Sequence, residues 1–244
     1  MNKQSNVYTI IYIIALVLVV GSLLAITATS LKPQQIDNAN ADKMRQILTS
    51  VHIPAEGSAV KEIFNKHITK MLIVDSQGNI VKESDGFDAD IFNVNIALQS
   101  KEADASKRQL PVFVCQTDKG VKYILPMSGA GLWGPIWGYI SVDADGSTIF
   151  GAYFSHEGET PGLGAEIEKP EFQARFDGLN LLSDNTFSPI QIVKTEADKA
   201  KNEVQGVSGG TITSKGVGDM VDNCLAPYAR FLDTLASQHN PVND

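Results

Sequence analysis

The N-terminal stretch of residues 8–26 carries no charged side chain and consists mainly of Ile, Leu, Val and Ala. A helix rises about 1.5 Å per residue, so about 20 apolar residues are enough to cross the hydrocarbon core of a bilayer. A cleaved signal peptide is the alternative, and the small residues at 25–28 offer a cleavage point. Signal peptides, however, have apolar runs of about 7–15 residues behind a basic head. Only Lys3 precedes this longer run, so we expect an uncleaved membrane anchor.

We place the anchor at residues 1–32 and one soluble domain at residues 33–244. The remaining chain of about 210 residues is long enough for one domain with a sizeable core, or for two small ones. Basic residues lie on both sides of the anchor, with Lys3 before it and Lys32, Lys43 and Arg45 after it. Charge counting therefore does not settle the orientation in the membrane.

The formal net charge of -8 argues against a nucleic-acid partner. Cys115 and Cys224 match no Cys-x-x-Cys metal or redox spacing, and either one disulfide outside the cytoplasm or two buried thiols would suit them. His156 and Glu157 have no second histidine at ligand spacing, so we expect no metal site. The chain lacks a nucleophile elbow, a P-loop and a dinucleotide-binding glycine pattern. We therefore expect no catalytic residues and no NADH site.

Hydrophobic periodicity predicts strands in the middle of the chain and helices at its ends, which indicates an α+β fold with an antiparallel sheet flanked by helices. Residues 87–108 are polar and mixed, and we expect them to form a surface excursion. The expected elements are helices at 42–51 and 60–68, hairpins at 71–81, 111–125 and 137–155, a strand at 191–194, and a final helix from Val217 kinked at Pro227.

Residues 208–214 place four hydroxyl side chains around a glycine pair just before this last helix. Gly209 and Gly210 allow the backbone to approach a ligand closely. The helix that follows directs unpaired N–H groups and its positive dipole end at the hydroxyls. The segment therefore suits a phosphate, bound or covalently attached. A capped helix start after a tight turn is the ordinary alternative.

Residues 207–217 read Val-Ser-Gly-Gly-Thr-Ile-Thr-Ser-Lys-Gly-Val. They resemble the flavinylation motif of the FMN-binding domain family, which is found in the C subunit of the sodium-pumping NADH:quinone reductase. In that family the Thr of a Ser-Gly-Ala-Thr core carries FMN through a phosphoester, which implies Thr211 as the acceptor and Thr213 as the second choice. The chain departs from the pattern at Gly210, where Ala is usual, and at Gln205, where an acidic residue is common. Glycine keeps the side chain small, whereas loss of the acid would weaken recognition by the attaching enzyme.

Two further blocks resemble the same family in the same order. Residues 156–164 read His-Glu-Gly-Glu-Thr-Pro-Gly-Leu-Gly and resemble the segment that lies against the flavin. Residues 129–139 resemble a Gly-Leu-Trp-Gly region of the family, in which Trp133 and Trp137 could form a stacking wall or pack over glycine turns. The implied cofactor-binding residues are Thr211, Ser208, Gly209, Gly210, Thr213, Ser214, Glu159, Thr160, Gly162 and Leu163.

The resemblance implies a flavoprotein subunit that carries covalent FMN and relays electrons inside a sodium-translocating NADH:quinone reductase. It also implies other subunits of that complex and a flavin transferase as partners, and a bacterial inner-membrane location with the soluble domain on the periplasmic side. Two alternatives remain. One is the corresponding flavinylated subunit of the related ferredoxin:NAD electron-transport complex. The other is a cofactor-free, membrane-tethered binding module, which would be colourless.

Overall fold

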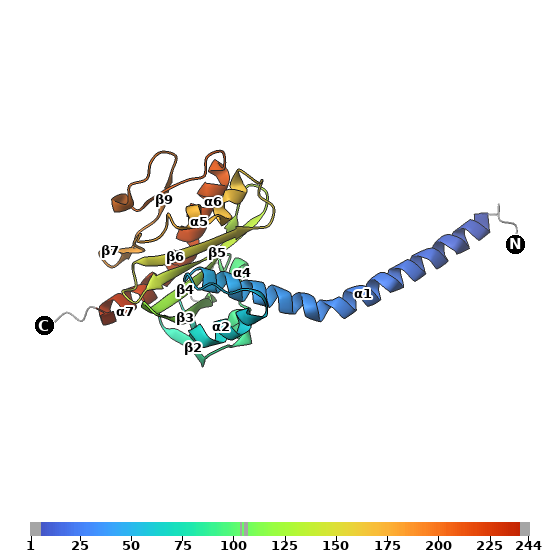
Figure 1. Ribbon diagram of the computed structural model, residues 1–244, viewed down its shortest axis with the longest axis horizontal. Coiled ribbons are helices and arrows are strands. Elements are labelled where there is room, and N and C mark those ends of the chain that lie inside the picture. Colours follow the sequence, from blue (N-terminus) through green and yellow to red (C-terminus); the bar gives the residue numbers. More distant parts are fainter. Residues whose placement is uncertain (1–5, 103, 105–106, 240–244) are drawn as a thin grey trace. The chain divides into compact units, whose positions relative to one another are not determined.

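The computed structural model describes residues 6–102, 104 and 107–239. Two compact units divide the chain, Met1–Lys43 and Met44–Asp244. The first unit is helical, and the second contains the sheet and the helices that pack on it. Figure 1 shows both parts of the chain in ribbon form.

Helix α1 runs over Asn6–Thr49 and contains Pro33. Its N-terminal part is long and apolar enough to cross a membrane, and the side chains of this span are not buried in the protein. The helix expected at 42–51 is the C-terminal end of α1, which stops at Thr49. In this end Met44, Ile47 and Leu48 are buried, because helical spacing puts them on one face.

A six-stranded antiparallel sheet in the order β2-β1-β3-β4-β5-β6 forms the centre of the second unit. The three predicted hairpins are confirmed. The second one is longer than expected, because β4 continues to Ala130. The strands are β1 (Ile68–Val74), β2 (Ile80–Asp85), β3 (Leu110–Thr117), β4 (Gly120–Ala130), β5 (Pro135–Asp143) and β6 (Ile149–His156).

Side chains on both faces of the sheet are buried, in two separate hydrophobic clusters. In β1, Leu72 and Val74 join one cluster whereas Met71 and Ile73 join the other. This alternation follows from the two-residue period of a strand. Helices α6 (Thr211–Leu225) and α7 (Ala229–His239) cover one face, and α2 (Val60–His67) and the end of α1 cover the other (Figure 1).

The segment 87–108 is not simply a surface excursion, which corrects the prediction. It contains α3 (Ala89–Phe92) and α4 (Ile96–Gln99), and Asp88 caps α3 by accepting the N–H groups of Asp90 and Ile91. Phe92 is buried, and the centroid of its ring lies 5.9 Å from that of Phe64 and 6.4 Å from that of Phe113. A few apolar side chains thus anchor an otherwise polar stretch.

Short elements complete the domain. They are η1 (Gly57–Ala59) near the start of the unit, and then, after β6, η3 (Gly164–Glu168), α5 (Pro170–Gln173), the hairpin β7 (Leu182–Ser183) and β8 (Thr186–Phe187), β9 (Gln191–Val193), η4 (Lys199–Lys201) and β10 (Glu203–Gln205). The expected strand at 191–194 is present as β9, and it pairs in parallel with β10. This pairing brings residue 205, just before the Gly-Gly motif, beside Val193.

The last helical region bends where Pro227 predicted it would. Helix α6 ends at Leu225, and η5 (Ala226–Tyr228), which contains Pro227, separates it from α7. Both cysteines are buried and free. Cys115 belongs to one hydrophobic cluster and Cys224 to the other, so the sheet separates them and no disulfide joins them. The fold is α+β, as the sequence predicted.

Candidate functional site

The glycine pair of the 208–214 segment makes the turn that starts α6. Gly209 has a φ of 76°, a left-handed conformation that glycine adopts without strain. Gly210 precedes the helix, and no side chain caps the helix start. The first N–H groups of an α-helix have no partner within the helix. The start of α6 therefore offers donors and a positive dipole end to an anion.

The four hydroxyls of this segment have different environments. Ser208 and Thr211 are exposed, whereas Thr213 and Ser214 are each only 1% exposed. The Thr213 hydroxyl donates to Glu159 Oε2 at 2.5 Å, and Ser214 Oγ accepts the N–H of Val207 at 2.8 Å. Thr211 is thus the accessible hydroxyl in the first turn of α6.

The loop 157–164 lies directly beside this helix start. A Cβ added at Gly209 would come within 2.6 Å of Leu163 Cδ2, and one added at Gly210 within 3.1 Å of the Leu163 carbonyl oxygen. The Thr160 carbonyl accepts the N–H groups of Leu163 and Ala165, both at 3.1 Å. These bonds fix the loop so that Leu163 stays 43% exposed at the surface. Two blocks distant in sequence therefore lie side by side at the start of α6.

Glu159 links a third segment to the site. Its Oε1 accepts the N–H of Trp133 at 2.8 Å, and its own N–H donates to His156 Nδ1 at 3.1 Å. Burial raises the pKa of this carboxyl, but the hydrogen bonds from Thr213, Trp133 and Leu132 outweigh burial and leave the pKa below its usual value. Glu159 therefore holds the β4–β5 loop against the start of α6 as an ionised group.

The two tryptophans do not form one stacking wall. Trp133, in the β4–β5 loop, is 69% exposed at the site. Trp137 lies in β5, and its indole N–H donates to Gln46 Oε1 of α1 at 3.0 Å. Trp137 is thus tied to the end of α1, a contact that the sequence did not predict, whereas Trp133 is exposed at the surface.

A groove of about 510 Å³ runs along the start of α6. This volume falls in the range of about 300–1,000 Å³ that is typical of ligand pockets. Thr211, Ser214 and Lys215 line one side, and Ile192, Val193 and Lys194 of the β9 region line the other. The sequence identified Thr211 and Ser214 but not the β9 residues, because a short strand pattern carries no ligand signal.

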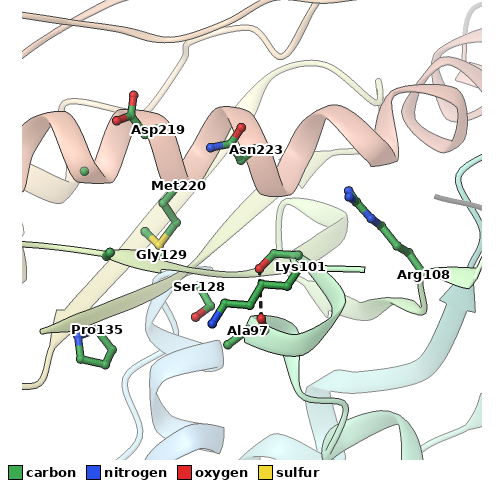
Figure 2. Close-up of a pocket in the computed structure, with 12 residues that line it drawn as sticks. Ala97, Lys101, Arg108, Ser128, Gly129, Pro135, Asp219, Met220 and Asn223 are labelled. Atoms are coloured by element: carbon green, nitrogen blue, oxygen red, sulfur yellow. Dashed lines mark hydrogen bonds between the residues drawn. The ribbon is translucent and has the colours of Figure 1, made fainter. Parts of the chain in front are cut away.

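A second cavity, of about 850 Å³, lies against a different face of α6. Figure 2 shows Met220 pointing from α6 toward Gly129. Lys101 and Arg108 lie on the same side of α6 as Gly129, whereas Asp219 points away from the other side of the helix. None of the predicted cofactor-binding residues lines this cavity. No group of three or more potential metal ligands occurs among the described residues.

The chain matches a family model described as the FMN-binding domain over residues 131–226. This range includes the β4–β5 loop, the loop 157–164 and the start of α6. Two similar relatives, from Pasteurella multocida and Vibrio anguillarum, are both named as the C subunit of the Na(+)-translocating NADH-quinone reductase. The first is 32% identical, and the match covers 89% of this chain and 89% of the relative. The second is 34% identical, and the match covers 91% of both chains.

Solved structures agree with these matches. The crystal structure of the C subunit of a Na(+)-translocating NADH-quinone reductase from Parabacteroides distasonis has a TM-score of 0.74 and 42% identity, over 83% of this chain and 96% of that one. A Shewanella oneidensis structure named NqrC has a TM-score of 0.65 at 23% identity, over 81% of this chain and 98% of that one. At that identity the second match supports the fold alone.

Proposed function

The chain belongs to the family formed by the C subunit of the Na(+)-translocating NADH-quinone reductases, and on this premise we propose that it is a membrane-anchored electron carrier with FMN attached covalently to Thr211. The observation that carries the proposal is the environment of that hydroxyl. Thr211 is exposed in the first turn of α6, and the start of this helix has no side-chain cap.

A phosphoester at Thr211 would place a negative phosphate at the helix start. Backbone N–H groups of α6 and the positive dipole end stabilise an anion there. Ser208, Gly209, Gly210 and Ser214 line the same turn, and we assign them to the phosphate end of the cofactor. Thr213 is the weaker acceptor candidate, because its hydroxyl is buried and donates to Glu159.

The ring end of FMN needs a flat, largely apolar surface. Four large apolar side chains are exposed around the site, namely Leu132 (47%), Trp133 (69%), Leu163 (43%) and Ile212 (59%). Exposed apolar groups that gather in one place mark binding surfaces. We assign Leu163 and the adjacent backbone of Thr160 and Gly162 to the isoalloxazine ring. When bound, FMN supplies the redox chemistry, and the protein supplies position and electrostatics.

The proposed role in the complex is electron relay between neighbouring carriers. The sequence has no dinucleotide-binding glycine pattern, so we assign NADH oxidation to another subunit. The uncharged span of α1 also cannot form an ion path alone, because such paths need polar groups inside the bilayer. We propose that residues 1–32 anchor the chain in a bacterial inner membrane and that residues 33–244 lie on the periplasmic side. Its partners would be the other subunits and a flavin transferase.

The test is co-expression of the full chain with a flavin transferase, followed by in-gel flavin fluorescence after denaturation. Fluorescence is expected in the wild type and in Thr213→Ala, and it should be absent from Thr211→Ala, which should remain folded. Fluorescence that persists in Thr211→Ala and disappears in Thr213→Ala would move the acceptor to Thr213. A colourless wild type would instead indicate the cofactor-free tethered module.

A further inference from the structure

Glu159 is a buried carboxylate that lies beside His156. Glu159 is 5% exposed, and it forms no ion pair with Lys or Arg among the described residues. Buried carboxylates are normally paired with a cation or protonated, because removal of a charge from water is costly. Hydrogen bonds, and after them the interaction with His156, nevertheless lower the pKa of Glu159, so the structure keeps an ionised carboxylate at this position without a Lys or Arg partner among the described residues.

Neutral donors take the place of a cation. Oε2 accepts the Thr213 hydroxyl, Oε1 accepts the N–H of Trp133, and the backbone of Leu132 contributes a further hydrogen bond. Hydrogen bonds to an ionised group are stronger than those between neutral groups. The donors come from two segments, the β4–β5 loop and the first turn of α6, so the carboxylate fixes both relative to the loop that carries it.

Two glycines shape the space around this carboxylate. A Cβ added at Gly131 would lie 2.4 Å from Oε1, and one added at Gly164 would lie 2.4 Å from Oε2. Both distances are far shorter than a non-bonded contact. The pocket therefore admits the carboxylate only because these two positions lack side chains.

We propose that Glu159 is a positioning residue that holds one fixed negative charge beside the flavin and thereby lowers the flavin's reduction potential. The inference rests on the proposed attachment of FMN at Thr211. This residue lies two positions before Thr213, whose hydroxyl donates a hydrogen bond to Glu159. Addition of an electron to the ring creates negative charge, which a nearby fixed anion opposes. At an effective dielectric constant of about 20, a unit charge about 10 Å away changes such an equilibrium roughly tenfold.

The experiment measures the reduction potential of the purified, flavinylated full chain by titration with dithionite against a reference dye. Dithionite is oxidised and supplies each electron that the flavin gains. In Glu159→Gln the flavin should be about tenfold more reduced at equilibrium with the dye, which corresponds to about 59 mV for a one-electron step. The matched control is Glu157→Gln, which removes the same charge from an exposed side chain of the same loop, and its shift should be clearly smaller.

Thr213→Val separates charge from structure. It removes the hydroxyl that Glu159 accepts but leaves the carboxylate in place, so its shift at pH 7 should be smaller than that of Glu159→Gln. Equal shifts in the two variants would show a structural effect and overturn the proposal. An unchanged potential in Glu159→Gln would also overturn it. A wild type without covalent flavin would contradict the proposed function instead, and the two failures are therefore distinguishable.

If Glu159→Gln yields no folded holoprotein, the pH dependence of the flavin's reduction potential in Thr213→Val tests the proposal instead. Loss of the hydroxyl donor moves protonation of Glu159 toward neutral pH, so the potential of this variant should rise above that of the wild type as the pH falls. The titratable group that acts on Glu159 is His156 of β6, which itself lies 3.8 Å from Glu168 of η3, and both are the same in the two proteins. Identical profiles would overturn the proposal.

Discussion

Thr211 and Thr213 differ in what surrounds their hydroxyl groups, and this difference decides which one an enzyme can reach. The exposed hydroxyl of Thr211 is accessible in the folded chain. The hydroxyl of Thr213 is buried and bonded to Glu159, so its modification would first require local unfolding. The motif in the sequence contains both threonines and ranks them only by resemblance, because spacing along the chain does not report burial.

At the residue scale, the stability contributed by Glu159 should depend on pH. Its pKa in the folded protein lies below the ordinary value of 4.5, so the ionised group stabilises the fold above that value. This contribution is lost as the pH falls through the lowered pKa. Glu159→Gln should cost about 2 kcal/mol at pH 7, the size expected of hydrogen bonds to a charged group, and less below pH 4.5.

Urea unfolding of both proteins at pH 7 and at pH 3.5 would measure this difference. A gap between wild type and variant that is as large at the lower pH would contradict the assignment of an ionised Glu159. The sequence could identify His156 and Glu159 but not this network. The link from Glu159 to Trp133 and Thr213 joins the loop after β6 to the β4–β5 loop and to the first turn of α6, and these segments meet only in the fold.

At the scale of single elements, α6 lies unusually close to the end of β4. A Cβ added at Gly216 would come within 2.4 Å of the Ala130 carbonyl oxygen, and one added at Gly218 would meet Ile192 Cγ1 at 2.7 Å. The first contact is with backbone, which cannot move without the sheet, whereas the second is with a side chain that can rotate. Gly216 therefore sets the distance between the helix that carries Thr211 and the sheet.

Gly216→Ala should consequently destabilise the domain by about 1–3 kcal/mol, the usual cost of overpacking. Without the contact, alanine would stabilise the helix by up to about 1 kcal/mol, so the sign of the change is informative. Gly218→Ala is the matched control in the same helix and should cost less. Thermal unfolding of the three proteins measures this order, and a Gly216→Ala variant at least as stable as the wild type would disprove the close packing.

The elements that the sequence predicted well are those with a regular pattern. The three hairpins alternate apolar residues or end in turn residues, and the last helix shows an apolar face from Val217 to Leu232 that is buried in the structure. Irregular elements were missed. Phe92 is buried through contacts with Phe64 and Phe113, and β10 exists because it pairs with β9. Both depend on residues distant in sequence, and hydrophobic periodicity reports only on neighbouring residues.

At the scale of the whole molecule, the chain combines a helix that is long and apolar enough to cross a membrane with a domain that has its own core. Both hydrophobic clusters lie within Met44–Asp244, whereas the apolar side chains of the α1 span are exposed. A long helix with exposed apolar side chains is stable in the hydrocarbon core of a bilayer and unstable in water. The two units therefore differ in the solvent that suits their surfaces, which is the basis of the next prediction.

Removal of residues 1–43 should therefore release a folded domain from the membrane. The full chain is expected in the membrane pellet after carbonate extraction, and the truncated chain in the supernatant with an intact, cooperative unfolding transition. A truncated chain that remains in the pellet while folded would show a second membrane contact. A full chain released by carbonate would argue against an integral anchor.

The central claim, covalent FMN at Thr211, is tested most directly by the intact mass of the full chain. The protein would be purified from its native host, or after co-expression with a flavin transferase, and then mapped by peptide mass spectrometry. The account predicts the mass of the chain plus one FMN less one water, with the modified peptide assigned to Thr211. An unmodified mass under these conditions would contradict the account and leave a tethered module without a cofactor.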